Sequence, residues 1–241
     1  MRKLVIGDIH AGLKALEQVF AKVEVTTSDH LIFLGDYVDG WSQAVETVDF
    51  LLQLATTHRC TFIRGNHDAL CNEWLTTKRD NPLWFQHGGM ATMTSYEEAS
   101  TITKERHIEF YNGLEDYYLD EQNRLFLHAG FTNVKGVTFE YFTKTFYWDR
   151  TLWELALSLN PTLKKQDVYY PKRLALYQEI YIGHTPVTRI GKTTPQKAVN
   201  VWNIDTGAAF KGPLSVMDVN TKQVWQSDPV FTFYPEERGR N

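Results

Sequence analysis

The sequence predicts an α/β fold with a mainly parallel sheet covered by helices. Two amphipathic helix patterns, at residues 13–24 and 42–57, alternate with three short apolar segments at residues 4–6, 31–34 and 61–63. The helix patterns repeat apolar residues every three or four positions, whereas the apolar segments have the length of buried strands. Such β-α-β-α-β alternation is typical of parallel strands joined by helical crossovers.

The rest of the chain combines an insertion with further strands. Residues 69–120 lack strand patterns and contain a helix pattern near 104–115, so we expect a helical insertion there. A further strand is expected at 125–127, and an aromatic-rich stretch with a helix near 151–159 follows it. In the C-terminal part, short β-like runs alternate with turns, which predicts an antiparallel portion or a second sheet. Because no repeat or linker is visible, we expect a single domain over residues 1–241.

Composition restricts the classes of function and partner. A hydrophobic content of 43% and a charged content of 22% are typical of soluble globular proteins. The net charge of -4 argues against nucleic-acid or membrane partners, and no apolar stretch reaches the ~18 residues of a spanning helix. Two isolated cysteines, Cys60 and Cys71, are too few for a disulfide framework. We therefore expect a cytoplasmic protein.

Five apolar runs end in the same way, with Gly close to Asp or His. The five endings are Gly7-Asp8-Ile9-His10, Gly35-Asp36-Tyr37-Val38-Asp39, Gly65-Asn66-His67-Asp68, His128-Ala129-Gly130 and Gly183-His184. In open α/β sheets, ligands bind beyond the carboxyl ends of the strands, so these side chains are expected to converge on one edge. Each ending taken alone also has a plain structural interpretation, such as a turn, a helix cap or a buried histidine. Their recurrence favours a shared functional site.

The chemistry of these residue types predicts a pair of divalent metals. The six candidate ligands are Asp8, His10, Asp36, Asn66, His128 and His184. Carboxylate and imidazole groups suit Mn, Fe or Zn, and we expect Mn, with Fe or Zn as alternatives. Because a carboxylate can bridge two cations, this set indicates two metals whose bridging hydroxide attacks phosphorus in line. His67 is the candidate general acid, and Asp39 would hold its tautomer or, alternatively, cap the following helix.

In this order, the five motifs resemble those of the calcineurin-like metallophosphoesterases. They are most similar to the branch with serine/threonine protein phosphatases and symmetrical diadenosine tetraphosphate hydrolases, which the run from Ile204 to Ala208 also resembles. The resemblance implies a two-sheet β-sandwich core flanked by helices, with the dimetal site at the strand C-terminal edge. It assigns the acid role to His67 with Asp39. For the first metal it implies the ligands Asp8, His10 and Asp36, and for the second Asp36, Asn66, His128 and His184.

The sequence offers two candidate arginines for binding the substrate phosphate, but one arginine of the motifs is absent. Arg150 lies where many bacterial relatives place a phosphate-binding arginine, and Arg64 is a second candidate with a structural salt bridge as its alternative. Gly40 stands where the resembling protein phosphatases have Arg, so one planar bidentate donor is missing. Asp68 replaces a Glu. Both departures weaken the protein-phosphatase assignment more than the family resemblance.

We therefore expect a dimetal-dependent phosphoester hydrolase, first of all a phosphomonoesterase of the serine/threonine protein phosphatase type. The alternative is a symmetrical diadenosine tetraphosphate (dinucleoside polyphosphate) hydrolase. A third hypothesis is a non-catalytic module that keeps the fold and the metals. The expected partner is thus a phosphorylated substrate, either a phosphoprotein or a small phosphoester or nucleotide.

Two further groups of residues are expected to be structural. The histidines expected at the surface are His30, His58 and His107. The aromatic cluster, expected mostly in the core with stacking on a substrate base as the alternative, is Phe139, Tyr141, Phe142, Phe146, Tyr147 and Trp148.

Overall fold

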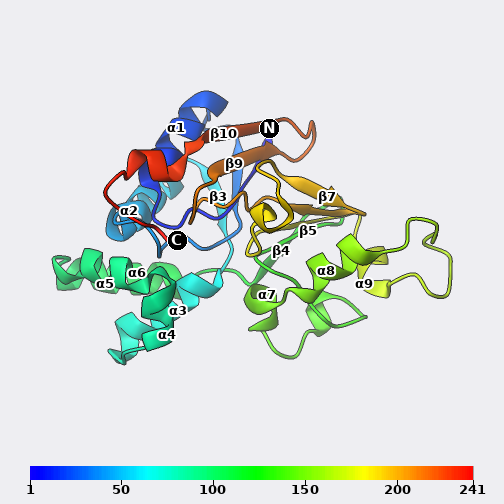
Figure 1. Cartoon of the computed structure of the whole chain (residues 1–241), viewed down its shortest axis with the longest axis horizontal. Helices are drawn as coiled ribbons and strands as arrows, with labels where there is room; N and C mark the ends of the chain where they lie inside the picture. The colour runs from blue at the N-terminus through cyan, green and yellow to red at the C-terminus, as the bar shows by residue number, and fades with distance from the viewer. Residues whose placement is uncertain (241) are drawn as a thin grey trace.

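The computed structural model describes residues 1–240 and has two five-stranded sheets at its centre (Figure 1). The first sheet has the order β10-β9-β1-β2-β3 and consists of β1 (Lys3–Ile6), β2 (His30–Phe33), β3 (Arg59–Phe62), β9 (Pro213–Asp218) and β10 (Val224–Pro229). The second sheet has the order β4-β5-β6-β8-β7 and consists of β4 (Tyr117–Leu119), β5 (Arg124–Leu127), β6 (Glu179–Ile182), β7 (Gln196–Ala198) and β8 (Val201–Asn203).

Both sheets mix parallel and antiparallel pairing. In the first sheet β1, β2 and β3 are parallel, with Leu4 opposite Leu31 and Leu31 opposite Cys60, while β9 and β10 add an antiparallel edge. In the second sheet β5, β6 and β8 are parallel, and β4 and β7 pair antiparallel at the two edges. The two-sheet α/β core is thereby confirmed. The five motif-bearing strands, however, divide between the sheets, because β5 and β6 belong to the second one.

Helices cover the outer faces of this pair of sheets. On the first sheet lie α1 (Leu13–Val23) and α2 (Ala44–Ala55), which are shown in blue in Figure 1. The segment expected as a helical insertion holds α3 (Asn66–Thr77), α4 (Pro82–Trp84), the π-helical turn Phe85–Gly89, α5 (Met90–Glu97) and α6 (Thr101–Asn112). Against the second sheet pack α7 (Thr145–Trp148), α8 (Thr151–Ser158) and α9 (Lys172–Ala175). Short 3-10 turns occupy Val137–Phe139, Val187–Ile190 and Val230–Phe233. No helix within residues 1–240 is long and apolar enough to cross a membrane.

Successive side chains of a strand point to opposite faces, so each central strand packs against helices on one face and against the other sheet on the other face. In β1, Leu4 and Ile6 face the core beneath α1 and α2, whereas Val5 faces the second sheet. In β5 the inward residue is Phe126, which stacks on Tyr181 of β6 with ring centroids 4.7 Å apart. The residues between the sheets are almost fully buried, so packing of the two sheets buries apolar area that neither sheet covers alone.

Two histidines that were expected at the surface are buried in the structure. His30 and His107 are fully buried, so their assignment to the surface is wrong. His30 binds Thr61 Oγ1 through Nε2, and His107 lies between Tyr96 and Asp49, which shows that neighbouring polar groups allow these rings to be buried.

The aromatic cluster is likewise only partly core. Phe146 and Tyr147 are buried, whereas Phe139, Tyr141, Phe142 and Trp148 are exposed. The segment after β5 forms short turns rather than a long element, so only part of its apolar side chains can reach the second sheet.

A buried ion pair joins the two sheets at the start of β1. Lys3 Nζ lies 2.9 Å from Asp120 Oδ2, and Arg124 NH2 lies 2.7 Å from the same oxygen. Burial by itself would raise the pKa of Asp120, but hydrogen bonds from Arg124 and Lys3 lower that pKa to about 2. Lys3 belongs to the first sheet and Arg124 to the second, so this carboxylate is shared by cations of both sheets.

We predict that Asp120→Asn lowers the free energy of unfolding by about 3 kcal/mol, because two buried cations lose their counter-charge. The measurement is urea unfolding at neutral pH. Since the pKa of Asp120 in the folded state lies below its ordinary value, the stabilisation is present above about pH 4 and is lost as the pH falls toward about 2. Glu121→Gln is the matched control, because Glu121 also binds Lys3 but is 70% exposed, and its loss should cost much less than that of Asp120. Equal effects of both variants would contradict this account.

Candidate metal centre and active site

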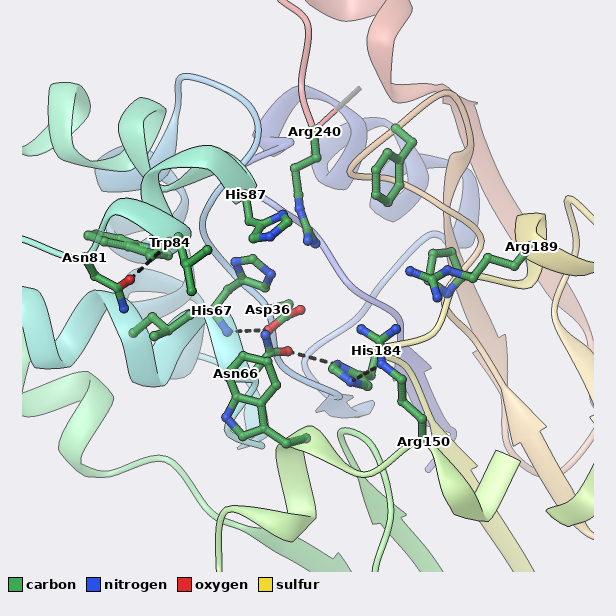
Figure 2. A pocket seen from close by; sticks show the side chains of 15 residues that line it. Asp36, Asn66, His67, Asn81, Trp84, His87, Arg150, His184, Arg189 and Arg240 are labelled. Carbon is green, nitrogen blue, oxygen red and sulfur yellow. Dashed lines mark hydrogen bonds between the residues drawn. The ribbon is translucent and has the colours of Figure 1, made fainter. Parts of the chain in front are cut away.

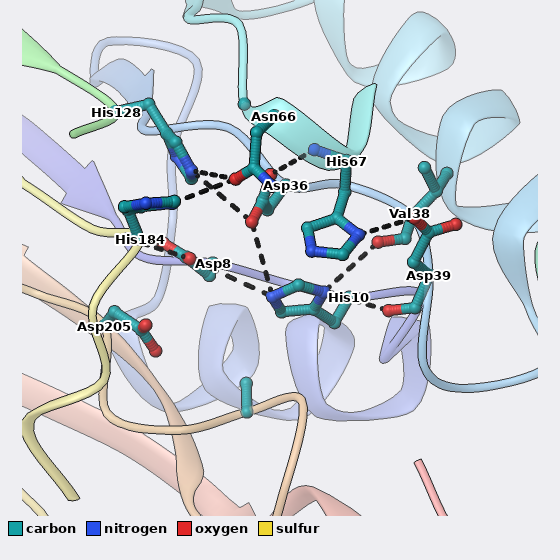
Figure 3. A network of polar contacts seen from close by, with 12 residues as sticks. Asp8, His10, Asp36, Val38, Asp39, Asn66, His67, His128, His184 and Asp205 are labelled. Atoms are coloured by element: carbon teal, nitrogen blue, oxygen red, sulfur yellow. Dashed lines mark hydrogen bonds and ion pairs between the residues drawn. The ribbon is translucent and has the colours of Figure 1, made fainter. Parts of the chain in front are cut away.

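The five motif endings meet in one buried cluster between the two sheets (Figure 3). The loops after β1, β2 and β3 place their side chains from the first sheet, and the loops after β5 and β6 place theirs from the second. All the candidate metal ligands are at most 8% exposed, and they are Asp8, His10, Asp36, Asn66, His128 and His184. The convergence that the sequence predicts therefore exists, but it spans the edge of a sandwich rather than the edge of one sheet.

The Asp36 carboxylate is common to two groups of possible metal ligands. One group joins Asp36 with Asp8 and His10, the other joins it with His128 and His184, and within each group the ligand atoms lie within 4.8 Å of one another. Asp36 Oδ2 is 3.6 Å from His10 Nε2 and 3.4 Å from His128 Nε2. This position, between two imidazole nitrogens, suits a carboxylate that bridges two cations.

The amide of Asn66 completes the second group. Asn66 Oδ1 lies 3.1 Å from His128 Nε2 and 2.9 Å from His184 Nδ1. An amide oxygen faced by two ring nitrogens is a neutral oxygen donor among nitrogen donors. Oxygen and nitrogen atoms crowded in this way match the ligand preferences of Mn, Fe and Zn.

Second contacts fix the tautomers of two of these histidines. His10 Nδ1 donates to Asp39 O at 2.9 Å, and His128 Nδ1 donates to Leu34 O at 2.8 Å. With the hydrogen on Nδ1, each ring directs the lone pair of Nε2 toward Asp36. A backbone carbonyl behind the ring is the usual arrangement for a histidine that binds a metal.

The electrostatics of the cluster also favour cations. Burial raises the pKa of Asp8 well above its ordinary value, and the charges of Asp205 and Asp36 raise it further. For Asp36, burial acts in the same direction, but the charge of His128, assisted by other nearby histidines, brings its pKa well below the usual range. A divalent cation would compensate the buried negative charge and replace the protons that otherwise do so. The donor set and its charge therefore fit a pair of divalent metals.

Unusual backbone conformations bring these side chains together. His10, Asp36, Asp39 and His184 all have positive φ, between 52° and 71°. Residues with side chains rarely adopt this left-handed region, and such strain clusters at functional sites. Close approach contributes as well, because a Cβ at Gly183 would lie 2.0 Å from Asp8 Oδ1.

The Asp68 carboxylate holds two of the loops in register. Its Oδ2 accepts the N–H groups of Asp36 and Gly65, and its Oδ1 accepts that of Tyr37, all at 2.8 Å. Burial and the charge of Asp36 raise the pKa of Asp68 to about 7, although the backbone donors act in the opposite direction. The Asp that replaces the expected Glu thus connects the loop after β2 with the start of α3.

His67 and Asp39 form a hydrogen-bonded pair beside the cluster. His67 Nδ1 donates to Asp39 Oδ2 at 2.6 Å, and the Nε1–H of Trp84 donates to the same oxygen. The His67 backbone N–H donates to Asp36 Oδ1 at 2.9 Å, which places the ring next to the shared carboxylate. With its Nδ1 hydrogen on Asp39, the ring presents Nε2 to the pocket and can hold a proton there. Trp84 follows Asp39 by 45 positions, and no pattern in the sequence indicates that it contacts this pair.

A pocket of about 730 Å³ opens over the cluster (Figure 2). Asp36, Asn66, His67 and His184 lie at its floor. Three arginines line it, namely Arg150, Arg189 and Arg240, of which the sequence identified only the first. Apolar and aromatic groups form much of the remaining wall, including Leu70, Leu83, Trp84, Trp148 and Phe210.

The two arginines proposed from the sequence behave differently. Arg150 lines the pocket, and its Nε donates to His184 Nε2 at 3.3 Å. Arg64 is absent from the pocket lining. Its guanidinium instead donates to Asp116 and to the carbonyls of Tyr111 and Leu114, which favours its structural alternative.

Asp205 is a buried carboxylate that the ligand prediction left out. It lies beside Asp8 in the cluster (Figure 3), and burial raises its pKa to about 6. Its Oδ1 accepts the N–H of Gly207 at 2.9 Å. Asp205 belongs to the run from Ile204 to Ala208, which resembles the family, so this resemblance is the sequence signal that points to it.

We predict that Asp8→Asn lowers the metal content from a pair of ions toward a single ion, because a neutral amide replaces a charged ligand of one group. Elemental analysis of the purified protein, combined with circular dichroism to verify folding, measures the effect. Asp80→Asn is the matched control, since Asp80 is exposed. Metal content equal to that of the parent protein would contradict the assignment of Asp8.

Comparisons with known proteins agree with the geometry. A profile of the calcineurin-like phosphoesterase family matches residues 1–209. A relative from Oceanobacillus iheyensis, named bis(5'-nucleosyl)-tetraphosphatase PrpE (asymmetrical), is 26% identical over 227 residues, covering 88% of this chain and 86% of the relative. A relative of the same name from Bacillus cereus is 25% identical and covers 98% of both chains. Among solved structures, a protein serine/threonine phosphatase from Saccharomyces cerevisiae has a TM-score of 0.61 and 14% identity, covering 95% of this chain and 80% of that one. This last likeness concerns the fold.

Proposed function

This chain belongs to the calcineurin-like phosphoesterase family and is a metal-dependent phosphatase, and from that premise we propose that it hydrolyses a phosphoanhydride bond of dinucleoside polyphosphates. The observation that carries the proposal is the convergence of three arginines on one pocket beside the candidate metal centre. The sequence alone favoured phosphomonoesters. The charge of the pocket reverses that order.

The family uses a dinuclear divalent metal centre, and we assign its ligands from the two groups around Asp36. Asp8, His10 and Asp36 would hold one metal, and Asp36, Asn66, His128 and His184 the other. When bound, the metal pair supplies a nucleophile at neutral pH and stabilises charge on the phosphoryl oxygens.

The arginines match a substrate with several phosphates. A phosphomonoester carries about two negative charges, which the metals already compensate. Arg150, Arg189 and Arg240 add three guanidinium groups around the same floor, and each can donate a planar pair of N–H groups to a phosphate. A chain of phosphates extending from the reacting phosphorus would meet these groups.

Aromatic walls supply a complementary contact for a nucleoside. Trp148 is 45% exposed, and together with Phe210 it lines the pocket. A base stacked on such a ring gains about 1–3 kcal/mol by analogy with single-stranded nucleic acids. The names of the relatives, which refer to asymmetrical cleavage of bis(5'-nucleosyl) tetraphosphates, are consistent with this substrate class.

Hydrolysis of phosphomonoesters, as in phosphoproteins, is the second candidate. The observation that favours it is the pair of His67 with Asp39, because His67 Nδ1 is bound to Asp39 and Nε2 is thereby left to hold a proton at the pocket floor. A leaving alkoxide needs such a proton, whereas a nucleotide phosphate leaves as a much weaker base. The pair therefore matters most for substrates with poor leaving groups.

A substrate panel separates the two candidates. The protein loaded with Mn²⁺, Fe²⁺ or Zn²⁺ is offered diadenosine tetraphosphate, a phosphoserine peptide and an aryl phosphate, and products are resolved by ion-exchange chromatography. We predict that kcat/KM for the tetraphosphate exceeds that for the peptide by at least about tenfold. ATP with AMP identifies asymmetrical cleavage, and ADP alone identifies symmetrical cleavage. Faster release of phosphate from the peptide would overturn the proposal in favour of the second candidate.

We predict that His67→Ala lowers kcat by about 10²–10⁴ for an alkyl phosphate and far less for an aryl phosphate, because only the first leaving group requires the proton. Metal content should stay at the parental value. His58→Ala, which removes a partly exposed histidine away from the pocket, is the control. If His67→Ala slowed both esters equally, His67 would act in binding and not as an acid.

A further inference from the structure

Arg240 reaches the pocket from a part of the chain that carries none of the five motifs. It follows Gly40 by 200 positions, yet it lines the pocket and its side chain lies against Gly40. We propose that Arg240 supplies the phosphate-binding guanidinium that the sequence lacks at Gly40 and that it binds the phosphates adjoining the reacting one. The inference deepens the proposed function and rests on it for the substrate class.

The side chain of Arg240 occupies a slot made by two glycines. Gly40 N–H donates to Gly88 O at 3.3 Å, so the loop after β2 and the turn before α5 are neighbours. A Cβ at Gly88 would come within 3.0 Å of Arg240 Cγ, and one at Gly40 within 3.5 Å. Both glycines have positive φ, above 100°. A side chain at Gly88 would crowd the stem of Arg240, and one at Gly40 would begin in van der Waals contact with it, so Arg240 lies against the position where the motif lacks its Arg.

The segment before Arg240 is fastened to the loop that contains Gly40. Glu237 accepts hydrogen bonds from Ser42, at 2.9 Å from its N–H and 2.7 Å from its hydroxyl. Tyr234 stacks on Trp41 with ring centroids 5.3 Å apart. The Arg240 N–H itself donates to Ala209 O at 2.9 Å. These contacts set the direction in which the side chain leaves the backbone.

The guanidinium ends in the pocket without forming an ion pair, although its charge acts on the buried carboxylate of Asp205. Figure 2 shows Arg240 pointing toward the floor where Asp36 and His67 lie. Its Cζ stands 5.4 Å above the ring centroid of Phe210, and its buried Nε has no hydrogen-bond partner. Throughout residues 1–240, no carboxylate forms an ion pair with Arg240. An unused buried donor of this kind indicates a missing acceptor.

The three pocket arginines influence one another directly. Burial lowers the pKa of Arg150, and the charges of Arg189 and Arg240 lower it further. Bringing like charges together costs free energy, and a purely structural role would not require it. An anionic ligand lying among the three groups would attract each of them and so offset their mutual repulsion.

Binding of inorganic tripolyphosphate tests the proposal without relying on turnover. Calorimetric titration of the holoenzyme in Ca²⁺ gives the dissociation constant, and the same compound is tested as a competitive inhibitor of aryl phosphate hydrolysis in Mn²⁺. We expect Arg240→Ala to raise both the dissociation constant and the inhibition constant about 10- to 100-fold, which is the range for a lost hydrogen bond to a charged group. Arg240→Lys should recover part of the loss, because it keeps the charge but not the planar pair of donors.

Arg238→Ala is the matched control, since it removes the same charge from the same segment and Arg238 is exposed. It should change tripolyphosphate binding less than about twofold. Equal weakening by Arg238→Ala and Arg240→Ala would overturn the proposal, because general charge would then explain both. Unchanged binding in Arg240→Ala, together with a lower urea midpoint, would overturn it in favour of a structural role.

The two proposals fail in different ways. If the parent protein cleaves no dinucleoside polyphosphate but Arg240→Ala still weakens the binding of tripolyphosphate, the proposed substrate is wrong and the role of Arg240 stands. If the parent cleaves the tetraphosphate and Arg240→Ala binds tripolyphosphate as tightly as the parent does, the proposed substrate stands and the proposed role of Arg240 is wrong.

Discussion

The contact of Asp36 with histidines from both sheets is the interaction on which the site depends. Its Oδ2 lies between His10, which follows β1, and His128, which follows β5. A buried carboxylate is costly unless it is paired, so these contacts favour one relative position of the sheets. At the other end of β1, Asp120 is shared between Lys3 and a cation of the second sheet. Polar contacts thus fix the sandwich at both ends of a single strand, while apolar packing between the sheets supplies most of the cohesion.

The strain in the site is balanced by hydrogen bonds around it. Left-handed conformations at residues with side chains cost roughly 1–3 kcal/mol each. Asp68 offsets part of that cost by accepting three backbone N–H groups from two loops, one of which carries Asp36. These hydrogen bonds therefore hold the loops in backbone conformations that an unconstrained chain would avoid. Ligand atoms arranged in this way before any metal binds need little reorganisation on binding.

Charge is distributed unevenly over the pocket. Carboxylates and imidazoles form its floor, and arginines form its rim, although the chain as a whole carries a net charge of -4. The floor attracts cations, and the rim attracts the phosphates that reach beyond them. This arrangement is the physical basis of the proposed action on extended polyanions.

The sequence by itself determined the α/β class and the six ligand candidates, because side-chain periodicity and the residues at strand ends are local features that do not depend on how the chain packs. The fate of Arg64 and the burial of His30 depended on neighbours that the sequence does not place beside them. Trp84 and Arg240 reach the site across long separations in the chain, and no pattern near either residue indicates it. The tertiary structure alone decided these points, since contacts between distant segments arise from how the two sheets and the last segment pack, and not from the order of residues within any one of them.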